Sequence, residues 1–141
     1  LIPTLKDWVA GNITAVKQKD EEATYCWQKD ISKENAKIIW DTYEPEYIER
    51  MVRALVPWPV AWTILSDSFQ DSIAGKRIKI FEAELVNIKH NRNPGELFSK
   101  NDMVLFATKV RNTTLRIKTF QLEGKSKTAE KQFLNGIQGD L

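Results

Sequence analysis

Cysteine and histidine are almost absent from this 141-residue chain, which has one of each. Cys26 alone cannot form an internal disulfide, and a single histidine leaves no cluster with the ligand spacing of a zinc site. A Cys-His or Ser-His-Asp arrangement would need His90 as its base, and His90 lies in a polar run that favours a solvated loop histidine. The favoured interpretation of Cys26 is a small packed apolar residue. The sequence therefore predicts neither a metal centre nor a nucleophile with its base.

Clustered glycines and long apolar runs are also missing. The six glycines are scattered, so neither a dinucleotide fingerprint nor a phosphate-binding loop is present. The longest apolar stretch, residues 55–65, is interrupted by prolines and is too short for a membrane span, so we expect no membrane partner. The chain begins at Leu1 without an initiator Met or a signal-peptide pattern, which leads us to expect a fragment of a longer protein.

The net charge of +2 hides a separation of charge along the chain. Residues 1–75 contain eight basic and twelve acidic residues, whereas residues 76–141 contain thirteen basic and seven acidic ones. Most of the excess lies in residues 87–127, with nine Lys or Arg and three acidic residues. An exposed surface of that kind attracts phosphates, and the alternative is an ordinary surface of mixed charge.

Helical patterns are few and short. Residues 5–10 allow one or two helical turns, and the charged, aperiodic run at residues 18–24 is typical of a linker. A helix is predicted near residues 44–56, capped by Asp41 or Thr42, because apolar residues recur there at helical spacing. A short C-terminal helix is predicted over residues 129–135, capped by Thr128.

The remaining pattern has a period of two and predicts strands at residues 60–65, 76–88, 103–107 and 115–122. Within the second strand the inward face must change near Ile80, as a β-bulge would make it do. A similar change between Ile117 and Phe120 argues for a strongly curved, closed sheet. We therefore expect a mainly β fold, a small OB-like or Greek-key barrel with the two helices added.

Two groups of side chains could suggest chemistry but favour a structural interpretation. Glu82 and Glu84 are spaced like an acid–base pair, yet a solvent-facing strand edge explains them better. Exposed tryptophans can stack on the bases of a single-stranded nucleic acid, which is a third, weaker possibility for function. We interpret the four candidate tryptophans mainly as core: Trp27, Trp40, Trp58 and Trp62.

Basic residues supply the candidate binding site. Lys109 and Arg111 are two apart, as are Arg116 and Lys118, and on a strand that spacing directs each pair to one face. The full set of predicted phosphate contacts is Lys89, Arg92, Lys109, Arg111, Arg116, Lys118, Lys125 and Lys127.

Six segments resemble the C-terminal domain of methionyl-tRNA formyltransferase, in the order and spacing of that family. The most specific is Arg-Ala-Leu-Val-Pro-Trp-Pro at residues 53–59. The other matching segments lie at residues 22–25, 38–40, 94–97, 122–125 and 133–136. This chain departs from many relatives at Val60, at residues 109–112, at Ser126 and at Thr128, which leaves the contacts of the loop at 109–112 open.

The resemblance implies an OB-like barrel that helps to hold initiator methionyl-tRNA. It implies that residues 1–20 are the end of a catalytic domain with its linker, and residues 21–141 the barrel. An N-terminal catalytic domain absent from this chain would transfer the formyl group from 10-formyltetrahydrofolate, in bacterial cytoplasm or an organellar matrix. No residue here matches the catalytic motif, and we expect no cofactor in this domain. The alternative is a structural or oligomerisation barrel of a sugar- or folate-linked formyltransferase.

Overall fold

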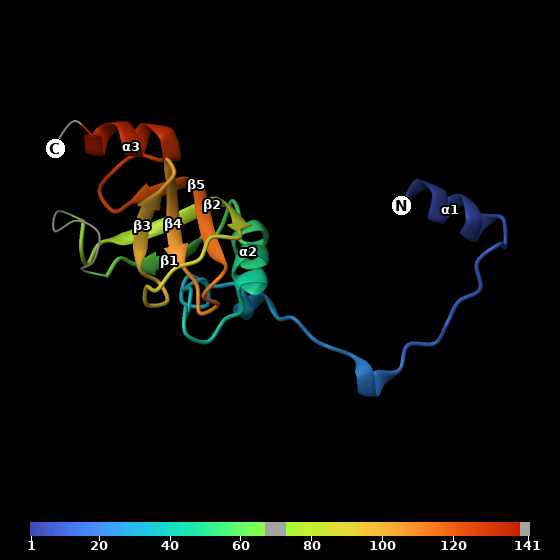
Figure 1. The fold of residues 1–141 in the computed structure, drawn as a ribbon. Helices are drawn as coiled ribbons and strands as arrows, with labels where there is room; N and C mark the ends of the chain where they lie inside the picture. The colour runs from blue at the N-terminus through green and yellow to red at the C-terminus, as the bar shows by residue number, and fades with distance from the viewer. Residues whose placement is uncertain (67–72, 139–141) are drawn as a thin grey trace.

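A six-stranded antiparallel sheet forms the body of the molecule in the computed structural model, which describes residues 1–66 and 73–138 (Figure 1). Its strands lie in the order β1-β2-β5-β4-β3, and the short β6 pairs with β5. The strand bounds are β1 Ala61–Ile64, β2 Arg77–Val86, β3 Leu97–Lys100, β4 Met103–Ala107, β5 Thr114–Leu122 and β6 Thr128–Ala129. The predicted mainly β, barrel-like class is confirmed, but in the described residues the sheet is not closed.

The edge of the sheet at β1 is partly covered by an irregular segment. The Ile38 N–H donates to the Trp62 carbonyl at 2.8 Å, and the Trp62 N–H donates to the Ala36 carbonyl at 3.0 Å. These bonds form a parallel bridge beside β1. The changes of inward face predicted a closed sheet. The described sheet is instead curved and open, with one edge protected by this segment.

The predicted bulge lies where the apolar pattern places it. Ile80 pairs with Phe120 and Glu82 with Thr119, so Phe81 is an extra residue on β2. Ala83 pairs next with Ile117, which makes Lys118 an extra residue on β5. These two register shifts carry the change of inward face on both strands and increase the local twist.

The strand β3 was missed by the sequence pattern, and its turn is the signal that could have found it. Asn101 and Asp102 both have positive φ, of 54° and 56°, in the two-residue connection to β4. This is the backbone of a type I′ hairpin turn, which favours Asn and Asp because these residues tolerate the left-handed conformation.

Helix α2, Pro45–Ala54, packs its buried face against the sheet. The expected cap by Asp41 or Thr42 is wrong: Glu44 is the N-cap residue, without a side-chain cap bond, and Pro45 begins the helix. The C-terminal helix α3 spans Glu130–Gln138, because Thr128 lies in β6 instead of capping it. On α3, Phe133 meets the Phe120 ring edge-on at 5.0 Å.

The core lies between the sheet, α2 and the segment around Trp40. The Trp40 ring stacks on Phe106 with centroids 4.7 Å apart, and its Nε1 donates to the Thr63 hydroxyl at 3.0 Å. Gly95, with φ of 81°, lies directly against the Trp40 ring, so a side chain at this position would collide with the indole.

Residues 1–22 are exposed throughout. They contain α1, Ile2–Val9, and the 3-10 turn η1, Asp20–Glu22, and they stand apart from the sheet in Figure 1. A second 3-10 turn, η2, spans Gln28–Asp30. Within the described ranges, no helix combines the length and apolar character that a membrane crossing requires.

Candidate functional site

Two of the predicted cations lie in a loop, whereas the sequence analysis placed them on a strand. β4 ends at Ala107 and β5 begins at Thr114, so Lys109 and Arg111 belong to the connection. The Thr108 hydroxyl organises this loop by donating to the Thr113 carbonyl at 2.6 Å and accepting from the Val110 N–H at 3.2 Å. The strand expectation was wrong because residue spacing alone does not reveal such a turn.

Lys109 is used to hold this loop against the start of α2. Its Nζ lies 2.7 Å from the Glu44 carboxylate and donates to the Thr42 carbonyl at 2.9 Å. The charges of Lys109 and Glu44 neutralise each other, so this ion pair adds little net charge to the surface.

Lys89, Arg92 and Arg111 come together where two loops meet. The His90 N–H donates to the Arg111 carbonyl at 2.9 Å, and Arg111 Nη1 lies 3.4 Å from the Arg92 carbonyl. Arg92 also pairs with Glu96, and its guanidinium lies 4.8 Å above the Phe98 ring centroid. Lys89 and Arg111 are exposed and have no carboxylate partner among the described residues.

His90 anchors this pair of loops from inside, contrary to the expectation of a solvated histidine. It is 8% exposed, with Nε2 at 3.3 Å from the Val110 carbonyl. Its Nδ1 is buried without a hydrogen-bond partner. The polar neighbours of His90 in the sequence conceal that its ring packs beside Phe98.

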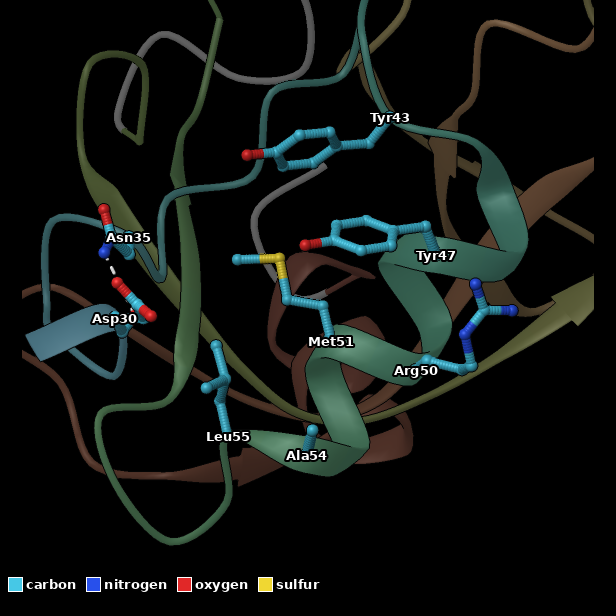
Figure 2. Close-up of a pocket in the computed structure, with 8 residues that line it drawn as sticks. All are labelled: Asp30, Asn35, Tyr43, Tyr47, Arg50, Met51, Ala54 and Leu55. Atoms are coloured by element: carbon cyan, nitrogen blue, oxygen red, sulfur yellow. Dashed lines mark hydrogen bonds between the residues drawn. The ribbon is translucent and has the colours of Figure 1, made fainter. Parts of the chain in front are cut away.

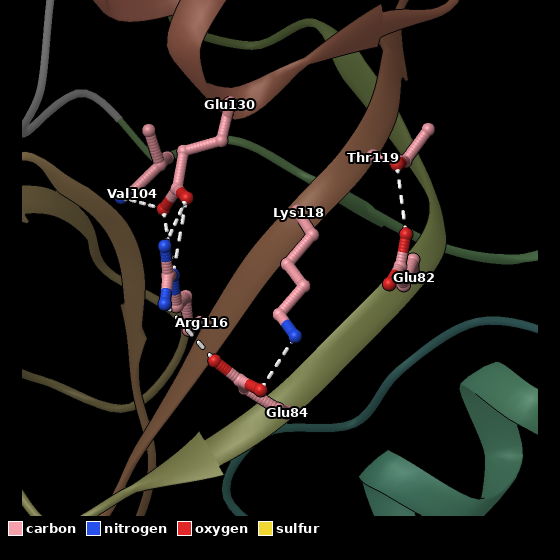
Figure 3. Close-up of polar contacts among 7 residues, drawn as sticks. All are labelled: Glu82, Glu84, Val104, Arg116, Lys118, Thr119 and Glu130. Atoms are coloured by element: carbon pink, nitrogen blue, oxygen red, sulfur yellow. Dashed lines mark hydrogen bonds and ion pairs between the residues drawn. The ribbon is translucent and has the colours of Figure 1, made fainter.

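Arg116 and Lys118 project from the outer face of β5, opposite the buried Leu115 and Ile117, as the strand pattern predicts. Both cations also contact a carboxylate. Arg116 and Lys118 lie 3.0 and 2.6 Å from the two oxygens of Glu84 on β2 (Figure 3). Because β1 pairs with β2 only from Arg77 to Ile80, Glu84 lies on a stretch of β2 that pairs with β5 alone among the described strands, as a strand edge does. It is ion-paired there, however, and not simply solvated.

The second partner of Arg116 is Glu130, the first residue of α3. Arg116 Nη2 lies 2.7 Å and its Nε 3.0 Å from Glu130 Oε2, while Oε1 accepts from the Val104 N–H at 2.8 Å. Figure 3 shows the guanidinium between the two carboxylates. The Glu130 side chain is only 7% exposed, so the pair fixes α3 to the sheet.

This arrangement shifts two pKa values toward the charged forms. The hydrogen bond from Lys118, reinforced by the charges of Lys118 and Arg116, holds the pKa of Glu84 below its ordinary value, although partial burial opposes this. The hydrogen bond to Glu130 raises the pKa of Arg116. Two cations and two carboxylates together carry no net charge, so this part of the sheet contributes little to a long-range positive field.

Lys125 and Lys127 lie in the connection from β5 to β6, and both are exposed. Lys127 Nζ lies 4.2 Å from the Phe81 ring centroid, and Gln121 Nε2 donates to the Lys125 carbonyl at 2.9 Å. Neither lysine has a carboxylate partner in the described part of the chain.

The aromatic residues divide differently from the prediction. Trp40 is buried and Trp62 half-buried, but Trp27 and Trp58 are 61% and 58% exposed, so their assignment to the core was wrong. Cys26 is exposed as well, in a segment where Tyr25 stacks on Trp27 with centroids 6.2 Å apart. The exposure of these residues could not be predicted from composition, because the apolar residues in this segment have no regular period.

A cavity of about 430 Å³ lies between α2 and the segment around η2. In Figure 2 the Tyr43 and Tyr47 hydroxyls point to the same side, above Met51, while Arg50 extends away from them. Across the described residues, no group of three or more His, Cys, Asp or Glu is placed to bind a metal ion. The cavity offers aromatic and apolar surface together with the polar side chains of Asp30, Asn35 and Arg50.

Comparison with known proteins covers nearly the whole chain. Residues 30–138 match the family described as formyl transferase, C-terminal domain. The chain is 35% identical over 137 residues to methionyl-tRNA formyltransferase from Streptococcus mutans, covering 97% of this chain and 40% of that protein. It is 33% identical to the Flavobacterium johnsoniae enzyme of the same name, covering 97% of this chain and 41% of that protein.

Solved structures show the same fold at lower identity. HypX from Aquifex aeolicus, in complex with tetrahydrofolic acid, has a TM-score of 0.57 and 19% identity, covering 94% of this chain and 22% of that chain. This chain spans about two fifths of the length of the matched methionyl-tRNA formyltransferases. From the family match and the identity of these relatives, the chain belongs to the formyltransferase C-terminal domain family.

Proposed function

We propose that this domain holds initiator methionyl-tRNA by its phosphates, while an N-terminal domain absent from this chain performs the formyl transfer. The observation that carries the proposal is the distribution of cations without carboxylate partners. Among the eight predicted contacts, those without a carboxylate partner in the described part of the chain are Lys89, Arg111, Lys125 and Lys127, all in loops. Phosphate contacts of this kind set position and orientation without reading the base sequence.

The spacing of these cations fits an extended polyanion. Arg111 lies in the connection before β5, with the loop of Lys89 bonded to it through His90, and Lys125 and Lys127 follow the end of β5. A nine-residue strand spans about 26 Å at about 3.3 Å per residue. A small phosphorylated ligand cannot touch both groups, whereas an RNA can.

The remaining predicted contacts take supporting roles in this proposal. Lys109, Arg116 and Lys118 are neutralised by Glu44, Glu84 and Glu130, and they hold loops and α3 in place. Arg92 forms an ion pair with Glu96, next to Lys89 and Arg111. In this proposal the domain positions a substrate.

The names of the relatives, which contain methionyl-tRNA, support the identity of the polyanion. We propose that the complete protein works in bacterial cytoplasm or an organellar matrix, and that its other domain uses 10-formyltetrahydrofolate. Tethering the tRNA would raise its effective concentration at that domain, so catalysis gains without a contact to the reacting amine.

Charge reversal in the loops tests the proposal. Binding of fluorescent initiator tRNA is measured by anisotropy for this chain, for Lys89→Glu with Arg111→Glu, and for Lys125→Glu with Lys127→Glu. Each double variant should weaken binding roughly tenfold or more, because two phosphate contacts are lost.

The matched control is Lys17→Glu with Lys33→Glu, which changes the net charge equally at exposed sites outside these loops. It should weaken binding by less than about threefold, as expected for a screened long-range effect. Absence of tRNA binding by the unaltered chain, or equal losses in all three variants, would contradict the proposal.

A further inference from the structure

The outer face of the sheet changes character at the bulge on β2. Beyond the bulge lie Arg116 and Lys118, whose charges are cancelled by those of Glu84 and Glu130. Before it, Trp62, Lys79 and Gln121 form a row across β1, β2 and β5, because Lys79 is the register partner of both other residues. Arg77 and Lys79 are not among the predicted phosphate contacts, although they have the same two-residue spacing as Arg116 and Lys118.

Arg77 lies beside this row, over the Trp62 ring. Its guanidinium carbon is 4.3 Å from the Trp62 ring centroid, a cation–π contact that fixes the side chain over the indole. The indole is itself anchored, since Trp62 Nε1 donates to the Lys33 carbonyl at 2.7 Å. Arg77 is exposed, so a planar, charged group is presented at the surface in a fixed position.

Phe81 supplies a second flat group. It is the extra residue of the bulge, and a bulge re-aims a side chain relative to its strand. The ring is half-buried and lies under the exposed Lys127 ammonium, 4.2 Å away. The lysine stem is flexible, so the ammonium can move aside and leave the ring face to a ligand.

The charge of this face is not compensated as it is beyond the bulge. Among the described residues, the four cations Arg77, Lys79, Lys125 and Lys127 outnumber the carboxylates of Glu82 and Glu123 on the neighbouring positions. The Glu123 carboxylate accepts from the Arg77 N–H at 3.1 Å. An open hollow of about 230 Å³, where β2 begins and β5 ends, is lined by Arg77, Lys79, Gln121, Leu122, Glu123 and Gly124.

We propose that this face binds unpaired nucleotides of an RNA, with bases stacked on the Arg77 plane and the Phe81 ring. We call it the stacking face and define it as Trp62, Arg77, Lys79, Phe81, Lys125 and Lys127. Flat groups add affinity only for bases that have left a helical stack, and every base offers such a face. The lysines beside them neutralise the connecting phosphates. This inference rests on the proposed function in taking RNA as the ligand, but its stacking groups are separate from the loop cations.

Substitutions that keep charge and bulk separate stacking from simple attraction. Arg77→Lys keeps the positive charge and loses the plane, and Phe81→Leu keeps an apolar side chain and loses the ring. The probes are a single-stranded RNA of about twelve nucleotides and the duplex of the same sequence, within the site sizes known for such surfaces. Each variant should bind the single strand about 5- to 150-fold more weakly, with the salt dependence unchanged and the duplex affinity unaltered.

Tyr25→Leu is the matched control, because it removes an exposed aromatic ring outside the stacking face. It should leave both affinities unchanged. The inference is overturned if Arg77→Lys and Phe81→Leu bind the single strand like the unaltered chain, or if they weaken single strand and duplex equally. A circular dichroism melt of each variant establishes that a loss of binding is not a loss of fold.

The same set of proteins distinguishes this inference from the proposed function. Lys89→Glu with Arg111→Glu changes only the loop cations and should weaken tRNA binding while leaving the short single strand unaffected. If tRNA does not bind but the single strand does, the proposed function fails and the stacking face stands. If tRNA binds and the aromatic variants behave like the unaltered chain, only the stacking face fails.

Discussion

Arg116 on β5 and Glu130 on α3 form a paired contact, with Nη2 2.7 Å from Oε2, that ties the C-terminal helix to the centre of the sheet. The same carboxylate accepts from the Val104 N–H on β4. One buried glutamate therefore joins three elements, and a residue that the sequence suggests for phosphate binding has a structural partner instead.

Removing this carboxylate should destabilise the domain strongly. Glu130→Ala leaves the Val104 N–H without its partner and Arg116 with Glu84 alone, so we expect the free energy of unfolding to fall by about 3 kcal/mol. Urea denaturation at neutral pH measures this. The neighbouring Lys131→Ala, at an exposed position, should change it by less than about 0.5 kcal/mol. A loss below about 1 kcal/mol in Glu130→Ala would show that the contact does not hold α3.

Glu84 should give the domain a small acid sensitivity. Because its pKa is lowered in the folded state, its contribution is present above the ordinary value of 4.5 and is lost as pH falls through the lower, folded value. The side chain is 37% exposed, so this contribution is about 0.5–1 kcal/mol. Urea midpoints of Glu84→Gln and the unaltered chain should differ at pH 7 and converge at acid pH. A difference that stays constant with pH would refute the electrostatic origin.

Gly95 should tolerate no side chain. Gly95→Ala strains a backbone with φ of 81° and places a methyl group against the Trp40 ring, so we expect a loss of about 2–4 kcal/mol. Gly124 provides the control, since its φ of 75° is similar but nothing lies near an added Cβ. Gly124→Ala should cost about 1–2 kcal/mol in the same urea titration. Equal losses would mean that the approach to Trp40 contributes nothing.

The cancelled charges on β5 should matter little for RNA binding. Lys118→Gln leaves Glu84 paired with Arg116, and we expect tRNA affinity to change by less than about twofold. Lys127→Gln removes a cation without a carboxylate partner and should reduce the slope of log affinity against log salt by about one. Anisotropy titrations at several salt concentrations compare the two. A larger loss of tRNA affinity in Lys118→Gln than in Lys127→Gln would mean that the outer face of β5 binds the phosphates.

Features that depend on local chemistry could be predicted from the sequence. The apolar pattern around Ile80 and between Ile117 and Phe120 located both register shifts, because a strand must turn its buried side chains inward. The helix at Pro45–Ala54 followed from its apolar spacing. The basic character of the loops after Asn87 was also visible in the composition.

Features that depend on partners distant in the chain could not be predicted. Glu84 meets Arg116 across 32 positions, and only the register of β2 against β5 brings them together. His90 is buried by a loop some twenty residues away, through its contact with Val110. The stacking of Arg77 on Trp62 likewise needs the β1–β2 pairing, which no spacing within either strand reveals.

The most direct test of the account is the salt dependence of initiator tRNA binding to this domain. Four cations without carboxylate partners predict a slope of log affinity against log salt of about −3, roughly a 100-fold loss between 50 and 200 mM. Lys125→Gln with Lys127→Gln should halve that slope, because it removes two of the four. A slope near zero, or no change in the double variant, would contradict the claim that this domain holds tRNA by its phosphates.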